Sequence, residues 1–246
     1  MHVRDSRAFG RWQQAAEKIA ECEVFAAEIP LNQLEHSEEM LLEAAPLRGV
    51  LPARKFKQLR GLLRKGIGLD IKIWDHLPPI LIFQLIDEAL LSRDYPVSLD
   101  ESLWHYAQKE GRLLQGLETL AEQAGFLQQL SCNFQVRQLM ELGRRWPRHR
   151  RQTIRMASLY EAEEIDKLYQ CARQGAGRMR KLLLLDRNSR MAERLGRLVR
   201  SNTTFCAVGA AHLSGGKGML RLLKKAGFTV KPVKPAYSTV SLSDFE

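Results

Sequence analysis

Three ionisable residues follow short apolar runs that are typical of buried strands. Glu28 follows "VFAA", Glu118 follows "LLQGL", and His212 follows "CAVGAA". If these runs are parallel strands, their C-terminal ends share one edge of a sheet, where functional sites of α/β proteins lie. The three side chains can then converge on one metal ion or one reacting atom.

The residues around His212 leave space for a ligand. Gly209 permits either an unusual backbone angle or a close approach, and Ala210 and Ala211 have small side chains. An alternative is that His212 caps a helix expected to begin near Ser214, or forms a hydrogen bond within the core. The following "SGGKG" is similar to a phosphate loop but lacks the GxxxxGK[ST] spacing, so it is a weak signal.

The elements that must position these residues alternate between helices and short strands. Strands are expected at 23–29, 112–118, 203–210 and 228–233, and the last two flank a helix in the manner of a parallel crossover. The predicted fold is α/β, with a mainly parallel sheet flanked by helices. We expect a single domain over 1–246, with an all-helical insert at about 34–98.

The net charge of +10 by itself excludes few classes of function. Part of this charge lies in "RRWPRHRR" at 144–151. Such a segment can attract nucleic acid, anionic lipid or an acidic partner, but it is also typical of a solvated surface. No nucleic-acid-binding motif accompanies it, so we expect no nucleic-acid partner.

Other features of the composition narrow the class of protein. The four cysteines have no CxxC spacing, which argues against a zinc knuckle or a disulfide scaffold. The longest apolar stretches are too short to span a bilayer, so no transmembrane segment is expected. The other histidines are expected on insert or helix surfaces, away from the chemistry: His36, His76, His105 and His149.

Several motifs together resemble the TraB/GumN family, which includes the TIKI and PrgY proteins. "FCAVGAAHLSGGKGMLRLLKKAGFTVKPV" resembles the closing signature of that family, with its Gly-x-x-His motif. "GLETLAEQ" is similar to its Leu-Glu-Thr-x-x-Glu-Gln motif, and "DRNSRMAERL" to its Arg-Asn helix. "MHVRDSRAFG" followed by "VFAAEI" resembles the first Gly-Thr-x-His motif and the strand with the acidic residue.

The resemblance implies a fold of the erythromycin esterase/ChaN type and, for the TIKI branch, metal-dependent peptide cleavage. It assigns these residues to the site: His2, Glu28 and His212 as metal ligands; Glu28, Glu118, Arg187 and His212 as catalytic residues; and Gly209, Asn188 and Gln123 beside them.

This set of side chains is suited to hydrolysis. Neutral imidazoles and carboxylates can hold a divalent ion such as Mn, Co or Zn, while a remaining carboxylate acts as the base. Arg187 can stabilise an oxyanion or bind a substrate carboxylate, and Asn188 can orient a ligand. Alternatively, Arg187 and Asn188 only cap a helix, and Glu118 is a buried structural carboxylate paired with Arg187.

The chain begins at Met1–His2, without the strand and Gly-Thr that precede the first histidine in the family pattern. We expect Met1 not to be the natural start, and an apolar strand and an export signal to lie upstream. If such an export signal lies upstream, the expected location is the periplasm or cell envelope. Without one, the expected location is the cytoplasm.

The sequence therefore predicts a metal-dependent, peptidase-like hydrolase acting on a peptide or small molecule, with a homo-oligomer possible. The alternative is a non-catalytic protein of the same fold that binds a ligand or a haem-like cofactor at the strand ends.

Overall fold

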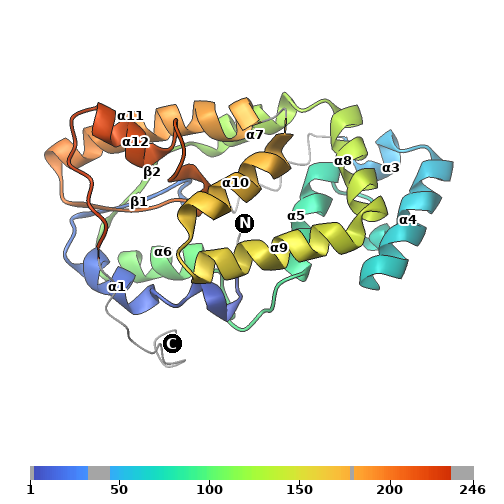
Figure 1. The fold of residues 1–246 in the computed structure, drawn as a ribbon, viewed down its shortest axis with the longest axis horizontal. Helices are drawn as coiled ribbons and strands as arrows, with labels where there is room; N and C mark the ends of the chain where they lie inside the picture. Colours follow the sequence, from blue (N-terminus) through green and yellow to red (C-terminus); the bar gives the residue numbers. More distant parts are fainter. Residues whose placement is uncertain (1–2, 33–44, 178–179, 234–246) are drawn as a thin grey trace. The chain divides into compact units, whose positions relative to one another are not determined.

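The computed structural model describes residues 3–32, 45–177 and 180–233, which form two compact units (Figure 1). The α/β unit comprises the described residues in 3–32, 92–119 and 156–233. The helical unit comprises 45–91 and 120–155.

The centre of the α/β unit is a three-stranded parallel sheet. Its strands are β1 (Val24–Ala27), β2 (Leu113–Gly116) and β3 (Thr204–Ala207), in the order β2-β1-β3. The structure is mostly helical around this small sheet, which confirms the predicted α/β class with flanking helices.

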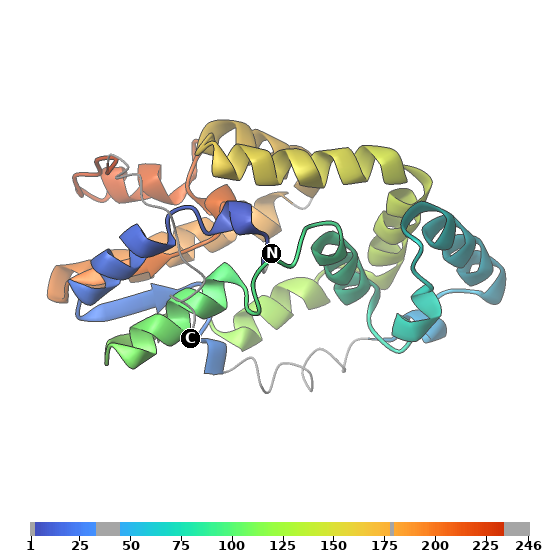
Figure 2. The same ribbon diagram turned by 90° about the horizontal axis from the view of Figure 1, so that it is seen from below.

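The central strand is apolar on both faces because both faces are covered. Phe25 contributes to a core with α1 (Trp12–Ala20) and α6 (Leu99–Lys109). Ala26, on the opposite face, packs in a second core with α11 (Asp186–Ser201) and α12 (Met219–Lys225). Figure 1 shows these helix pairs on the two sides of the strands, and Figure 2 views the strands from the side of α1 and α6.

Further elements also belong to the α/β unit. They are η1 (Ser6–Ala8), α10 (Ile165–Ala176), one π-helical turn η5 (Lys181–Leu185) and η6 (Ala210–His212).

The segment that precedes α1 is held by a buried carboxylate. Asp5 is 1% exposed and accepts hydrogen bonds from the Arg7 guanidinium at 2.7 and 2.6 Å. The Ser92 hydroxyl also donates to Asp5, at 2.7 Å. Asp5 therefore connects the beginning of the described chain to the segment before α6.

The predicted strand at 228–233 is wrong, because the structure has no strand there. The Phe228 amide donates to the Leu223 carbonyl at the end of α12, and the Phe228 ring packs against Gly196 of α11. Pro232 could not donate to a strand ladder. Packing of the aromatic ring on a helix has therefore outweighed its local strand preference.

The helical unit contains α3 (Leu47–Val50), α4 (Ala53–Ile67), η3 (Ile71–Trp74), α5 (Pro79–Ala89), α7 (Leu120–Gln128), α8 (Cys132–Arg144) and the first part of α9 (Trp146–Glu161). Fully buried Leu59, Ile82 and Leu139 lie in its core. The unit thus includes 120–155, beyond the insert expected at about 34–98. The single-domain organisation stays a prediction.

Candidate active site

The backbone places Glu28 and Glu118 side by side just beyond the ends of two neighbouring strands. The Leu117 amide donates to the Ala27 carbonyl at 2.8 Å, and the Glu118 amide to the Glu28 carbonyl at 2.7 Å. The pairing of β1 with β2 therefore continues past the last strand residues, and it brings both carboxylates to the C-terminal edge of the sheet.

Arg187 joins the two carboxylates. Its Nε and Nη2 donate to Oε2 of Glu118 at 2.8 and 2.6 Å, and Nη2 also donates to Oε2 of Glu28 at 2.8 Å. The Glu118 side chain is fully buried, whereas that of Glu28 is 25% exposed. Glu28 is therefore the carboxylate that solvent or a ligand can reach, and the contact between Glu118 and Arg187 expected as an alternative is present.

Arg187 is the second residue of α11, and this helix directly follows the π-helical turn η5. Arg194 lies two turns further along the same face of the helix, and its Nη1 donates to the Leu117 carbonyl at 2.8 Å. Sequence reasoning missed Arg194. The spacing of seven between the two arginines was the signal that could have found it.

His212 contacts the cluster through both ring nitrogens. Nε2 lies 3.8 Å from Oε1 of Glu28, and Nδ1 lies 2.5 Å from Oδ1 of Asn188. The Asn188 amide nitrogen donates to the Lys217 carbonyl at 2.8 Å, which leaves its oxygen to face the imidazole. Because that oxygen can only accept, Nδ1 of His212 carries the proton and Nε2 of the neutral ring presents a lone pair towards Glu28.

Gly209 is needed for close approach rather than for an unusual backbone angle, since its φ is −55°. Its amide donates to Oε1 of Glu28 at 2.5 Å. A Cβ atom at this position would lie 2.9 Å from the same oxygen and 3.5 Å from Cδ2 of His212. The missing side chain therefore lets the loop backbone bind the carboxylate.

The site favours an ionised Glu28 and a neutral His212. Burial acts to raise the pKa of Glu28, but His212, Arg187 and the Gly209 amide together lower it. Burial, assisted by the charge of Arg187, lowers the pKa of His212 although Glu28 acts in the opposite direction. The ionised Glu28 carboxylate therefore lies beside a neutral imidazole, an arrangement that attracts a cation.

The contacts given above do not include two of the predicted residues. His2 lies outside the described residues, and Gln123 is in α7 of the helical unit. His212 does not cap the following helix, because α12 begins only at Met219 with Gly218 as its N-cap. Gly215, with φ of +95°, interrupts the helix that was expected to start near Ser214.

A pocket of about 380 Å³ adjoins the loop that carries His212. Ser214 and Asp166, which are hydrogen-bonded to each other, line it together with Arg221 and Lys224 of α12. Glu28, Glu118 and Arg187 are not part of its lining. The pocket and the carboxylate cluster are therefore two separate features of the α/β unit.

The chemistry of the donors fits a divalent metal ion only in part. Glu28 and His212 present an anionic oxygen and a neutral imidazole nitrogen, and Asn188 supports the imidazole in the way that supporting residues usually hold metal-binding histidines. No group of three potential metal ligands occurs among the residues that the structure describes. The predicted third ligand, His2, is outside them.

These features define an α/β protein with a carboxylate, arginine and histidine cluster beyond the ends of parallel strands. A profile of the TraB/PrgY/gumN family matches residues 1–232, and the chain therefore belongs to this family.

One similar protein is described as a metalloprotease TIKI homolog, from Nematostella vectensis. It is 24% identical to the chain over 259 residues, which cover 80% of the chain and 54% of that protein. The chain thus spans about half the length of the relative it matches. No solved structure matches the chain. No helix in the described ranges is long and apolar enough to cross a membrane.

Proposed function

We propose that the chain is a metal-dependent hydrolase that cleaves peptide bonds, with its reaction at Glu28 and His212. The observation that carries the proposal is that the Nε2 lone pair of His212 faces Oε1 of Glu28 at 3.8 Å. Two electron-pair donors that face each other with no proton between them form a site for a cation. The negative charge of Glu28 and the similarity to a TIKI metalloprotease homologue support the same function.

Glu28 and His212 would hold the ion, with His2 as the predicted third ligand. When bound, a divalent ion such as Mn, Co or Zn supplies Lewis acidity, which polarises a carbonyl or activates water.

The remaining roles follow from the contacts within the cluster. Glu28 is the carboxylate that can face both the ion and a substrate, because its side chain is accessible while that of Glu118 is buried and paired with Arg187. Arg187 stabilises negative charge that develops on the substrate oxygen. Glu118 positions Arg187, and Asn188 keeps Nε2 of His212 unprotonated.

The proposal is tested with a mixture of fluorogenic peptides, incubated with Mn, Co or Zn and separately with a chelator. Cleavage should require a metal and fall by about 1000-fold or more in His212→Ala and in Glu28→Gln, since each removes a group that acts on the reacting atoms. His105→Ala is the matched control because His105 is an exposed residue of α6. Thermal melting of each variant checks that it is folded.

Two results would contradict the proposal. One is cleavage that persists in the folded His212→Ala and Glu28→Gln variants. The other is the absence of metal-dependent cleavage in the parent protein combined with stoichiometric binding of a small ligand or haem. The second result would instead support the non-catalytic ligand-binding alternative.

A further inference from the structure

Helix α4 has an unusual charge distribution for a surface helix. Its sequence, "ARKFKQLRGLLRKGI", contains six lysines or arginines and no acidic residue. Across the described residues of the helical unit, Lys and Arg number 15 and Asp and Glu number six. Positive charge is therefore concentrated in this unit.

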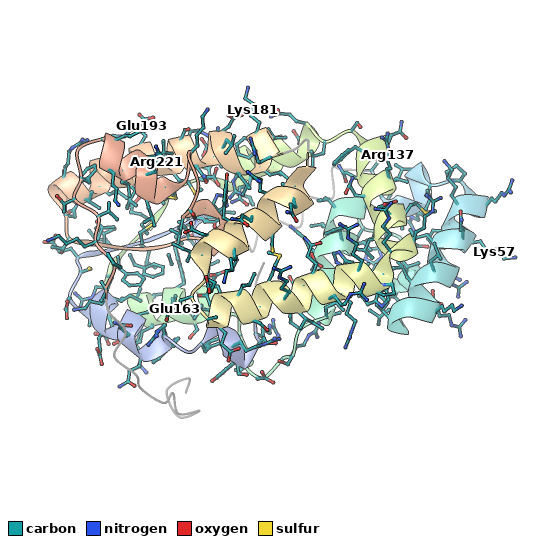
Figure 3. All side chains as sticks on the ribbon, viewed as in Figure 1. Lys57, Arg137, Glu163, Lys181, Glu193 and Arg221 are labelled. Carbon is teal, nitrogen blue, oxygen red and sulfur yellow. The ribbon has the colours of Figure 1, made fainter. Side chains whose placement is uncertain are left out.

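The cations of α4 lie on the side of the helix that faces away from the core. Leu59 and Leu63 are buried, at 0% and 1% exposure. Arg54, Lys57 and Lys65 are exposed, and helical spacing places them on the far side from the two leucines. Figure 3 shows Lys57 extending outwards from α4.

The next element adds an exposed aliphatic residue to this region. Arg60 of α4 donates through Nε and Nη2 to the Asp70 carboxylate at 2.7 and 2.5 Å, and Asp70 is the N-cap of η3. Within η3, Ile71 is buried but Ile73 is 59% exposed, and Lys72 beside it is exposed as well. The ion pair therefore holds an outward-facing isoleucine next to the cationic helix.

We propose that this basic surface, defined as Arg54, Lys57, Arg64, Lys65 and Lys72 with Ile73, binds the surface of an anionic lipid membrane. Lysines and arginines are attracted to acidic headgroups, and a projecting aliphatic side chain can enter the interfacial layer. Proteins that bind single-stranded nucleic acid add exposed aromatic rings on which bases stack. This surface offers an aliphatic residue instead, which favours lipid.

The test is co-sedimentation of the full chain with vesicles of phosphatidylcholine alone and with vesicles that also contain phosphatidylglycerol. Binding should require phosphatidylglycerol and weaken in high salt. About 1 kcal/mol per basic residue corresponds to about fivefold in partitioning, so R54Q/K57Q/K65Q should bind roughly 100-fold more weakly. Ile73→Ser should weaken binding several-fold without changing net charge.

The matched control is K109Q/K225Q/K231Q, which removes the same charge from three exposed lysines of the α/β unit. It should retain most of the binding. If both triple variants lost the same amount of vesicle binding, net charge alone would account for the binding and the proposal would be overturned. Equal binding of the parent protein to both kinds of vesicle would overturn it as well. Tighter binding to an oligonucleotide than to acidic vesicles at the same salt would overturn it in favour of nucleic acid. None of these outcomes depends on hydrolytic activity.

Discussion

His212 and Asn188 are joined by a buried hydrogen bond of 2.5 Å between Nδ1 and Oδ1, and this bond determines which imidazole nitrogen faces Glu28. Asn188 can have this effect only because the Lys217 carbonyl occupies its amide nitrogen. The tautomer of a side chain in the α/β unit is thus controlled by a backbone carbonyl five residues after it in the sequence.

Replacing Asn188 by Ala should release this control. We expect a mixture of His212 tautomers in ¹⁵N NMR spectra and a loss of about 10- to 100-fold in metal-dependent activity, as for other residues that support metal-binding histidines. Asn188→Asp keeps an acceptor for His212 but loses the donor to Lys217, so it should preserve the Nδ1–H tautomer at some cost in stability. An unchanged tautomer in Asn188→Ala would show that another group orients the ring.

Arg187→Met should destabilise the fold strongly, because it removes the guanidinium that is paired with both Glu28 and the fully buried Glu118. Breaking a buried ion pair in this way costs about 3–5 kcal/mol. Arg197→Met is the matched control on the same helix, since Arg197 and Glu193 form a surface pair with both side chains more than 60% exposed. Its cost should be below about 1 kcal/mol. Urea unfolding measures the free energy of unfolding of both variants. Similar losses of stability in the two variants would contradict a special role for Arg187.

Gly209→Ala should impair the site more than the fold. The added Cβ would lie 2.9 Å from Oε1 of Glu28, and the flexible carboxylate can move away while the loop keeps its path. We expect reduced activity with little change in melting temperature. Gly10→Ala serves as the control, since a Cβ there would have no atom within 4 Å. A large drop in melting temperature in Gly209→Ala but not in Gly10→Ala would contradict this expectation. It would indicate that the loop backbone, rather than the Glu28 carboxylate, moves to accommodate the added Cβ.

Asp5 should make the stability of the protein depend on pH in the acid range. Hydrogen bonds from the Arg7 side chain, opposed by burial and assisted by Ser92, hold its pKa well below the usual value. Because the folded pKa is lower than the unfolded one, this stabilisation is complete above the unfolded pKa of about 4 and is lost as pH falls towards the folded value.

Asp5→Asn should therefore lower stability by about 2 kcal/mol at neutral pH, the magnitude expected for hydrogen bonds to a charged group. Thermal melts recorded from about pH 7 to about pH 3 should show the difference from the parent shrinking towards the acid end. A constant difference over this range would rule out the ionised carboxylate as its source.

The sequence determined the strands and the strand-end residues of this protein. All three observed strands lie within runs predicted from their apolar residues. The physical reason is clearest for β1, where Val24, Phe25 and Ala26 are buried because both faces of the central strand are covered. Glu28, Glu118 and His212 could be selected for the same reason, since a polar residue marks the point where such a run leaves the core.

Local signals were less reliable where packing opposed them. "FTVKPV" has the composition of a strand, yet Phe228 packs on α11 and no strand forms. The helix predicted from Ser214 begins only at Met219, after Gly218. The first outcome depends on the contact of Phe228 with Gly196 of α11, and the second on the backbone angle of Gly215. Composition and periodicity register neither.

Only the tertiary structure decided how the site is connected. Arg187 reaches carboxylates 69 and 159 residues away and joins them in one cluster, of which only the Glu118 contact had been considered. The acceptor that orients Asn188 is the backbone carbonyl of Lys217, a group that every residue possesses and that no side-chain pattern can reveal. The sequence shows which side chains are available for chemistry, but the charge balance of the cluster and the tautomer of His212 depend on distances of a few ångströms that exist only after the chain has folded.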